Sequence, residues 1–288
     1  MKDYVIYIDT DSLFIAIRDF IKNTIGTDKW DQIDYKKRVE YILRISEVIS
    51  DYVNERVFNE TQLLDYNSQI KDFKISFKQE IVARNILFSK KKKYAYWMVN
   101  KEGIDKDNIE VTGLEIVRSD SSERVREMLM DIMVDILKGH DNELLRKKIN
   151  SYRTELTKVV PEEICVNIGV KDAAKYIVND KGMLKTTKGA PFSVKGIVAH
   201  NNLLNKLGLK DERIAGTGEK VKVVYLKKNI YGYTSFAFYR WLPQFDNHIK
   251  IDYNKMIETF FINKIKMLLE PAGMLELLEN NDIMSFFQ

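Results

Sequence analysis

The chain opens on two short apolar runs that flank a polar centre. Residues 4–8 and 13–17 are rich in β-branched and aromatic side chains, and the polar run 9–12 separates them. Two such runs around a short polar centre predict a β-hairpin. Further along, apolar residues recur every three or four positions between residues 35 and 58, which predicts a long amphipathic helix.

The rest of the chain alternates between the patterns of strands and helices. Short apolar or alternating runs predict strands over residues 73–77, 94–99, 109–117, 221–226 and 234–239. Helical spacing predicts helices over about 125–136, 144–156, 171–178, 194–207 and 253–269. The first of these helices follows Asp120–Glu123, which resembles a capping box, and Gly139 is its expected end.

Pro161 interrupts this pattern after a pair of helices, and we place a domain boundary there. A chain of 288 residues suits about two domains, here 1–160 and 161–288. The first combines an antiparallel sheet with packed helices, and the second is mainly helical with a small β portion. The predicted fold class is therefore α+β.

Charge is distributed unevenly along the chain, although the net charge is only +4. Residues 71–106 carry ten Lys/Arg and four Asp/Glu, and residues 161–240 carry fourteen and seven. Two basic segments on an otherwise acidic chain favour a polyanionic partner. A solvated lysine-rich surface is the alternative that charge alone leaves open.

The cysteine and histidine content and the length of the apolar runs exclude several classes of protein. Cys165 is the only cysteine, which excludes an internal disulfide and a cysteine-based zinc site and makes the reducing cytosol the default compartment. The three histidines lie far apart in the sequence and indicate no metal cluster. No apolar run approaches the roughly 18 residues of a membrane span, so we expect no membrane partner.

Asp9 and Asp11 lie at the centre of the predicted hairpin, although aspartate is rare in strands. At positions i and i+2 their carboxylates can lean to the same side, where they repel each other unless a cation compensates. Oxygen ligands of this kind suit magnesium. The alternative is an ordinary Asp-Thr-Asp turn whose side chains cap local backbone N–H groups.

Four consecutive lysines, Lys90 to Lys93, precede Tyr94. Like charges in a row repel each other and are stabilised by phosphates, and neighbouring aromatic rings can lie along sugars or bases. A solubilising loop is the alternative for this cluster taken alone.

The combination of these motifs resembles family B DNA polymerases. The sequence Tyr-x-Asp-Thr-Asp-Ser at 7–12 precedes a Lys-Lys-x-Tyr cluster by about eighty residues, and Glu80 lies eleven residues before Lys91. Residues 113–120 resemble the family's G-x-E-x-V-R-x-D segment. Further similar landmarks are Pro191-Phe192, 218–221, 271–274 and 283–287, of which the last two resemble polymerases of T-even-type bacteriophages.

The resemblance implies the C-terminal part of a polymerase: the rest of the palm over 1–160 and the thumb over 161–288. The family places the aspartate hairpin in mid-chain, after an exonuclease domain, a D-x-x-S-L-Y-P-S motif and a fingers helix that this sequence lacks. We expect a separately encoded subunit of a split phage polymerase, working with an N-terminal subunit in the host cytoplasm. An expression fragment and an intron-separated exon are the alternatives.

The resemblance also implies roles for individual residues. Asp11 and, less directly, Asp9 would bind two magnesium ions, for which manganese can substitute, and Glu80 would add a third carboxylate. Deoxynucleoside triphosphates would be the substrates. The primer–template duplex would be held by Lys91, Lys92, Lys93, Tyr94 and Lys220.

The C-terminal tail, residues 283–288, is apolar and follows a polar, helix-breaking run. Related phage polymerases end in a similar hexapeptide that binds a sliding clamp, which implies this partner for Ile283, Met284, Phe286 and Phe287. The alternative is that the tail folds back onto the protein.

The alternative function is a non-catalytic DNA-binding scaffold derived from a polymerase. A calcium-binding hairpin protein is a second rival, but it does not explain Lys91 to Tyr94 or the second basic domain.

Overall fold

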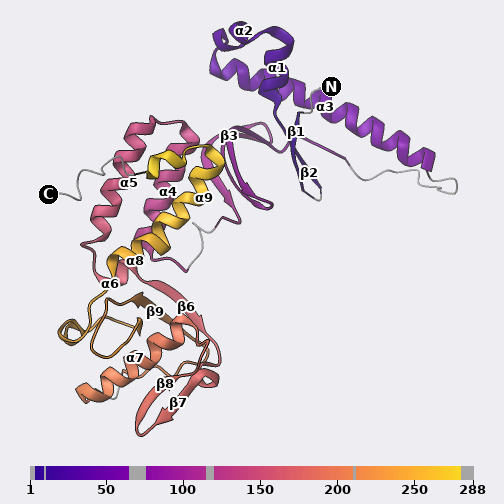
Figure 1. Cartoon of the computed structure of the whole chain (residues 1–288). Coiled ribbons are helices and arrows are strands. Elements are labelled where there is room, and N and C mark those ends of the chain that lie inside the picture. Colours follow the sequence, from indigo (N-terminus) through magenta and orange to yellow (C-terminus); the bar gives the residue numbers. More distant parts are fainter. Residues whose placement is uncertain (1–3, 10, 65–75, 115–119, 210–211, 280–288) are drawn as a thin grey trace. The chain divides into compact units, whose positions relative to one another are not determined.

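The computed structural model describes residues 4–9, 11–64, 76–114, 120–209 and 212–279, which form two compact units. The first unit comprises residues 1–86 and 90–112, and the second comprises 87–89 and 113–288. Each unit combines helices with antiparallel strand pairs (Figure 1). The predicted α+β fold class is confirmed. The predicted palm–thumb division at 160/161 concerns subdomains of the resembled family and stays a prediction.

Strands of the first unit form a two-stranded and a three-stranded sheet. They are β1 (Val5–Asp9) and β2 (Ser12–Ile15), then β3 (Ile81–Lys90), β4 (Lys93–Lys101) and β5 (Ile104–Thr112). The hairpin and the strand over 94–99 are therefore confirmed. The strand predicted over 109–117 instead begins at Ile104 and ends at Thr112. Of the strand predicted over 73–77, residues 73–75 lie outside the described residues, and 76–77 are not in a strand.

Helices of the first unit precede its three-stranded sheet. They are α1 (Ile17–Ile25), α2 (Thr27–Gln32) and α3 (Tyr35–Leu64). The long helix predicted from residue 35 is confirmed as α3. Its Val39 packs with Val82 of β3 and Val99 of β4 in a small core, with Ile42 and Leu43 on the same helix face. The apolar residues that recur every three or four positions in α3 therefore mark the helix face that packs against the sheet.

Most helices of the second unit lie near its beginning and its end in the sequence, and they carry many of its buried apolar residues. They are α4 (Glu123–Lys138), α5 (Asn142–Leu156), α6 (Pro161–Ile164), α8 (Tyr253–Ile257), a π-helical turn η4 (Glu258–Ile262), α9 (Asn263–Ala272) and the 3₁₀ turn η5 (Leu275–Leu278). The side chain that caps α4 is Ser122, which accepts from the N–H of Val125, and not the expected Asp120. The helix ends at Gly139 in the left-handed conformation, as expected.

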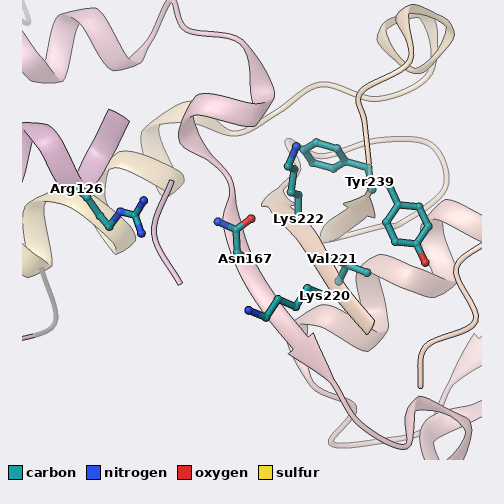
Figure 2. A pocket seen from close by; sticks show the side chains of 7 residues that line it. Arg126, Asn167, Lys220, Val221, Lys222 and Tyr239 are labelled. Atoms are coloured by element: carbon teal, nitrogen blue, oxygen red, sulfur yellow. The ribbon is translucent and has the colours of Figure 1, made fainter. Parts of the chain in front are cut away.

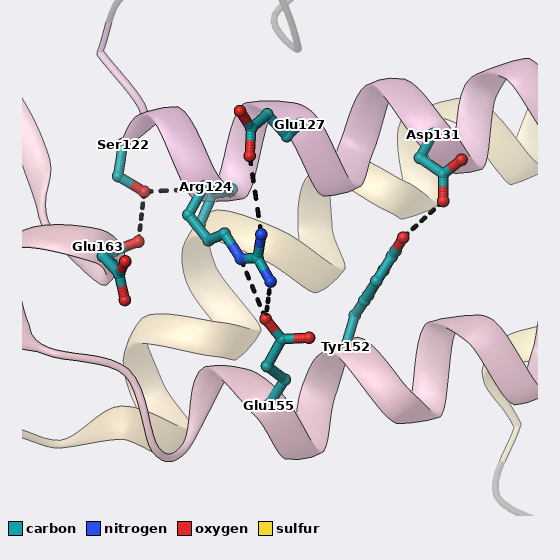
Figure 3. Close-up of polar contacts among 8 residues, drawn as sticks. Ser122, Arg124, Glu127, Asp131, Tyr152, Glu155 and Glu163 are labelled. Carbon is teal, nitrogen blue, oxygen red and sulfur yellow. Dashed lines mark hydrogen bonds and ion pairs between the residues drawn. The ribbon is translucent and has the colours of Figure 1, made fainter.

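Polar pairs join α4 to α5 (Figure 3). Arg124 pairs with Glu155, and the hydroxyl of Tyr152 donates to Asp131 at 2.5 Å. Burial, together with this hydrogen bond, raises the pKa of Tyr152 to about 12. The phenol therefore stays protonated near neutral pH and acts as a donor that fixes the two helices.

A three-stranded antiparallel sheet, the two-stranded β7–β8 hairpin and a helix complete the second unit. The elements are β6 (Val166–Val170), η2 (Ala173–Tyr176), β7 (Ile177–Asp180), β8 (Met183–Thr186), α7 (Phe192–Leu207), β9 (Glu219–Tyr225), β10 (Ser235–Phe238) and η3 (Pro243–Asn247). Strand β9 lies between β10 and β6, and α7 packs against β10. A Cβ atom on Gly196 of α7 would lie 2.7 Å from the backbone nitrogen of Ala237, so this contact requires glycine.

Two predicted helices differ from those observed. The helix expected over 171–178 is only the 3₁₀ turn η2, because Asp172 is left-handed (φ 52°) and the chain then enters β7. The helix expected over 253–269 is confirmed in outline and extends to Ala272, with Pro271 in its last turn. Proline offers no N–H to the carbonyl of Met267, which instead accepts from the hydroxyl of Ser89 at 3.2 Å.

Candidate functional site

The tip of the β1–β2 hairpin carries the two predicted aspartates. Asp9 ends β1 opposite Ser12, whose hydroxyl donates to the Asp9 carbonyl at 3.2 Å. Asp11 lies in the turn and is exposed, whereas Asp9 is half-buried. Strand pairing on both sides of the turn therefore keeps these two carboxylates at one end of a short sheet.

The turn between β3 and β4 carries the predicted basic cluster. It consists of Lys91 and Lys92, and Lys92 is left-handed (φ 59°). The N–H of Lys92 donates to the hydroxyl of Tyr7 at 3.0 Å, and its ammonium lies 3.4 Å from a carboxylate oxygen of Asp9. Because the Lys92 side chain is 62% exposed, solvent screens this ion pair, which orients the two groups more than it stabilises the fold.

An aromatic cluster holds the hairpin against the basic turn. Tyr7 and Phe14 of the hairpin lie 5.9 and 5.5 Å, between ring centroids, from Tyr94, and Tyr94 stacks on Tyr96 at 6.2 Å. Rings at these separations attract each other and bury apolar area. The acidic hairpin and the basic cluster, some eighty residues apart in the chain, are therefore brought together within the first unit.

Glu80, the predicted third carboxylate, lies elsewhere. It precedes β3, and its backbone carbonyl accepts from the N–H of Glu102, just after β4. This is the end of the β3–β4 pair opposite to the Lys91–Lys92 turn. Among the described residues, no three His, Cys, Asp or Glu side chains gather closely enough to hold a metal ion. The described residues therefore do not bring Glu80 to the aspartate hairpin, and its role as a third carboxylate stays a prediction.

Lys220 lies in the second unit, where it lines a pocket of about 440 Å³ (Figure 2). Arg126 of α4, Asn167 of β6 and Lys222 of β9 also line this pocket. Sequence reasoning selected Lys220 through a motif but missed these three residues. Lys222 follows Lys220 at the i+2 spacing that puts both side chains on one face of a strand, a signal that was present in the sequence.

The end of the segment over 113–120 has a structural role. Asp120 accepts from the buried ammonium of Lys264 at 3.4 Å, and the same ammonium lies 2.5 Å from the hydroxyl of Ser121. The carbonyl of Asp120 accepts from the N–H of Asn167 at 2.7 Å. These bonds tie the start of α4 to α9 and to β6. Residues 115–119 of this segment lie outside the described residues.

Two further predictions concern the protein's surroundings. The predicted clamp-binding residues Ile283, Met284, Phe286 and Phe287 lie outside the described residues, so the clamp stays a prediction. Within the part of the chain that is described, no helix combines the length and apolar character needed to cross a membrane.

Comparison with models of known protein families places the chain in one of them. A model of DNA polymerase family B matches residues 32–272, which is most of the chain. No individual curated protein matches it. The matched residues include the basic turn at Lys91–Lys92 and the pocket around Lys220, whereas the aspartate hairpin precedes them.

Proposed function

Because this chain belongs to DNA polymerase family B, we propose that it takes part in DNA-directed DNA synthesis and contributes Asp9 and Asp11 to the nucleotidyl-transfer site. The observation that supports this most directly is the contact between the aspartate hairpin and the basic turn, with Lys92 at 3.4 Å from Asp9. Carboxylates suit cations, and lysines suit phosphates. Their adjacency fits a site where a metal-bound nucleotide meets a primer end.

The chemistry of the donors fits magnesium. Asp9 and Asp11 offer the oxygen ligands that Mg²⁺ prefers, and such sites usually combine one or two carboxylates with substrate phosphates. When bound, Mg²⁺, or Mn²⁺ in its place, stabilises negative charge on the phosphates and lowers the pKa of the primer 3′-hydroxyl. The carboxylates of this chain orient the reactants, and Lys92 offsets their mutual repulsion. The primer 3′-oxygen attacks the α-phosphorus of the deoxynucleoside triphosphate, and pyrophosphate leaves.

Lys91, Lys92, Lys93 and Tyr94 are proposed to hold the primer–template duplex. Lys91 and Lys92 are exposed at the turn, and Tyr94 anchors that turn to the hairpin through Tyr7 and Phe14. Contacts of this kind to the backbone and minor groove hold any sequence, because minor-groove acceptors are similar across base pairs.

Lys92→Ala is expected to speed dissociation of the primer–template duplex by roughly three- to tenfold at low salt. The difference should shrink at higher salt, because counterions compete for phosphate contacts. Stopped-flow dissociation of a labelled duplex measures this effect, and Lys106→Ala removes an exposed charge of β5 as the matched control. Equal dissociation rates for wild type and Lys92→Ala at low salt would remove Lys92 from the duplex grip.

A partner polypeptide is proposed to complete the site. The sequence contains no D-x-x-S-L-Y-P-S motif, which supplies a further metal-binding aspartate in the family. The β1–β2 hairpin also exposes apolar side chains: Ile8 is 63% exposed, Ile6 49% and Leu13 42%. Two-stranded sheets are marginal alone, and an exposed apolar face favours a covering partner. We assign to this partner the other aspartate, the fingers and the exonuclease.

Primer extension tests the proposed function. The purified chain, given primer–template, deoxynucleotides and magnesium, is expected to incorporate no nucleotide, and proteins that co-purify with it from the native host should restore extension. Extension by the chain alone, absent from an Asp11→Asn preparation made in the same way, would contradict the need for a partner. If the chain binds the duplex but no co-purified protein restores extension, the result would instead support the non-catalytic scaffold.

A further inference from the structure

Helix α3, a single continuous helix in Figure 1, carries a second apolar stripe besides the face that packs on β3 and β4. Tyr41, Val48 and Tyr52 in this stripe are 40%, 69% and 65% exposed. With the half-buried Ile45 they follow one another at spacings of four, three and four residues, which line one side of a helix. Helices pair through apolar seams with this spacing, so the stripe has the form of a helix-pairing seam.

The charges of α3 are arranged against the stability of the helix on its own. Residues 35–46 carry four Lys/Arg and one Glu, whereas residues 47–60 carry four Asp/Glu and one Arg. A helix favours acidic side chains at its N-terminus and basic ones at its C-terminus, but α3 has no acidic residue in its first turn and no basic residue in its last. The separation of charge therefore favours an external partner of opposite charge order.

A second copy of α3 that runs antiparallel to the first matches both the stripe and the charges. The basic half of each helix then lies beside the acidic half of the other, whereas a parallel pair would bring like charges together. Lys37 lies one turn before Tyr41, and Glu55 lies one turn after Tyr52. When Tyr41 of one copy lies opposite Tyr52 of the other, Lys37 therefore meets Glu55. Within the described residues of one copy, neither Lys37 nor Glu55 forms an ion pair.

We propose that two copies of this chain associate through α3, as an antiparallel pair whose two-fold axis passes between Ile45 and Val48. The interface uses the same surface of both copies, so each contact occurs twice. The stripe covers only about three helical turns, which is less than a standard interface buries. The dimer is therefore weak, and its population depends on the protein concentration.

Sedimentation velocity of the full chain over a range of concentrations tests this proposal. Wild type is expected to pass from monomer to dimer as the concentration rises. Val48→Gln removes an apolar side chain from the centre of the stripe and should weaken association about tenfold. Because Val48 is largely exposed, this variant should keep the wild-type circular dichroism and melting temperature at concentrations where both proteins are monomeric.

Reversing charges tests the antiparallel arrangement. Lys37→Glu and Glu55→Lys are each expected to weaken association by roughly three- to tenfold at low salt, because each brings like charges together. The double variant restores opposite charges and should recover the wild-type affinity. Lys36→Glu is the matched control: it makes the same change at an exposed neighbouring residue that does not share a helix face with Lys37. Single variants that weaken association without recovery in the double variant would contradict the antiparallel pair.

Other results would overturn the dimer itself. A wild-type chain that stays monomeric at every concentration would exclude it, and equal losses in Lys36→Glu would reduce the charge effect to net charge. If the chain stays monomeric and Val48→Gln loses a protein that co-purifies with wild type, the stripe binds the partner polypeptide instead. The assay contains no DNA, nucleotide or metal ion, so failure of the proposed function leaves its result unaffected.

Discussion

Asp11→Asn is expected to lower the rate of nucleotide incorporation by the assembled enzyme about a hundred- to a thousandfold. The substitution keeps the size of the side chain but removes a charge that a divalent cation needs as the reacting phosphates gain negative charge. Asp11 is exposed in the turn between β1 and β2, so the fold should tolerate the change. Affinity for the duplex should therefore stay nearly constant while the rate falls.

Single-turnover incorporation from a preformed enzyme–duplex complex separates these two quantities. Asp51→Asn, which removes an exposed carboxylate in the middle of α3, is the matched control and should react at the wild-type rate. Asp9→Asn should lower the rate less than Asp11→Asn, and it also releases Lys92 from its ion pair. A normal rate for Asp11→Asn would withdraw the catalytic assignment of this residue.

Gly196→Ala is expected to destabilise the second unit by about 1–3 kcal/mol. The added Cβ would lie 2.7 Å from the nitrogen of Ala237 and 3.0 Å from the carbonyl carbon of Phe236. Both atoms belong to the backbone of β10, which cannot rotate away as a side chain does. The greater helix propensity of alanine offsets up to about 1 kcal/mol of this effect.

Thermal melting measures the effect, and each kcal/mol lowers the melting temperature of a unit of this size by about 2–4 °C. Gly169→Ala is the control, because a Cβ there has no heavy atom within 4 Å and its backbone is not left-handed. Equal melting temperatures for Gly196→Ala and wild type would show that α7 can shift away from β10 at little cost.

Local signals explain which parts of the fold were predictable. The spacing of Val125 and Leu129 and the stop at Gly139 are properties of α4 itself, so the sequence predicted this helix well. Strand β3 was missed because Arg84 and Asn85 interrupt its apolar alternation. The helix expected from residue 171 does not form, because Asp172 has a left-handed backbone conformation. The spacing of apolar residues in the sequence gives no information about that backbone angle.

The arrangement of the candidate site depends on tertiary contacts, which the sequence alone does not reveal. Motifs selected Asp9 and Lys92 one by one, but only the packing of Tyr7 and Phe14 on Tyr94 brings them together. The same limit applies to Glu80. Its distance in sequence from Lys91 suggested that it lies near the hairpin, but it lies at the end of the β3–β4 pair opposite to the Lys91–Lys92 turn. No sequence pattern singled out Arg126, because the residues that line the pocket with it come from other elements of the chain.

Strand β3 belongs to both compact units, since residues 87–89 are counted with the second and the rest of the strand with the first. This short piece gives the second unit one hydrogen bond, because the hydroxyl of Ser89 donates to the carbonyl of Met267 that Pro271 leaves without a helical donor. A fragment that begins at Gly113 therefore lacks this hydrogen bond. Neither unit is a single continuous segment of the sequence. The chain passes from one unit to the other three times, at 86/87, 89/90 and 112/113, so a chimera that exchanges one unit must keep all three junctions.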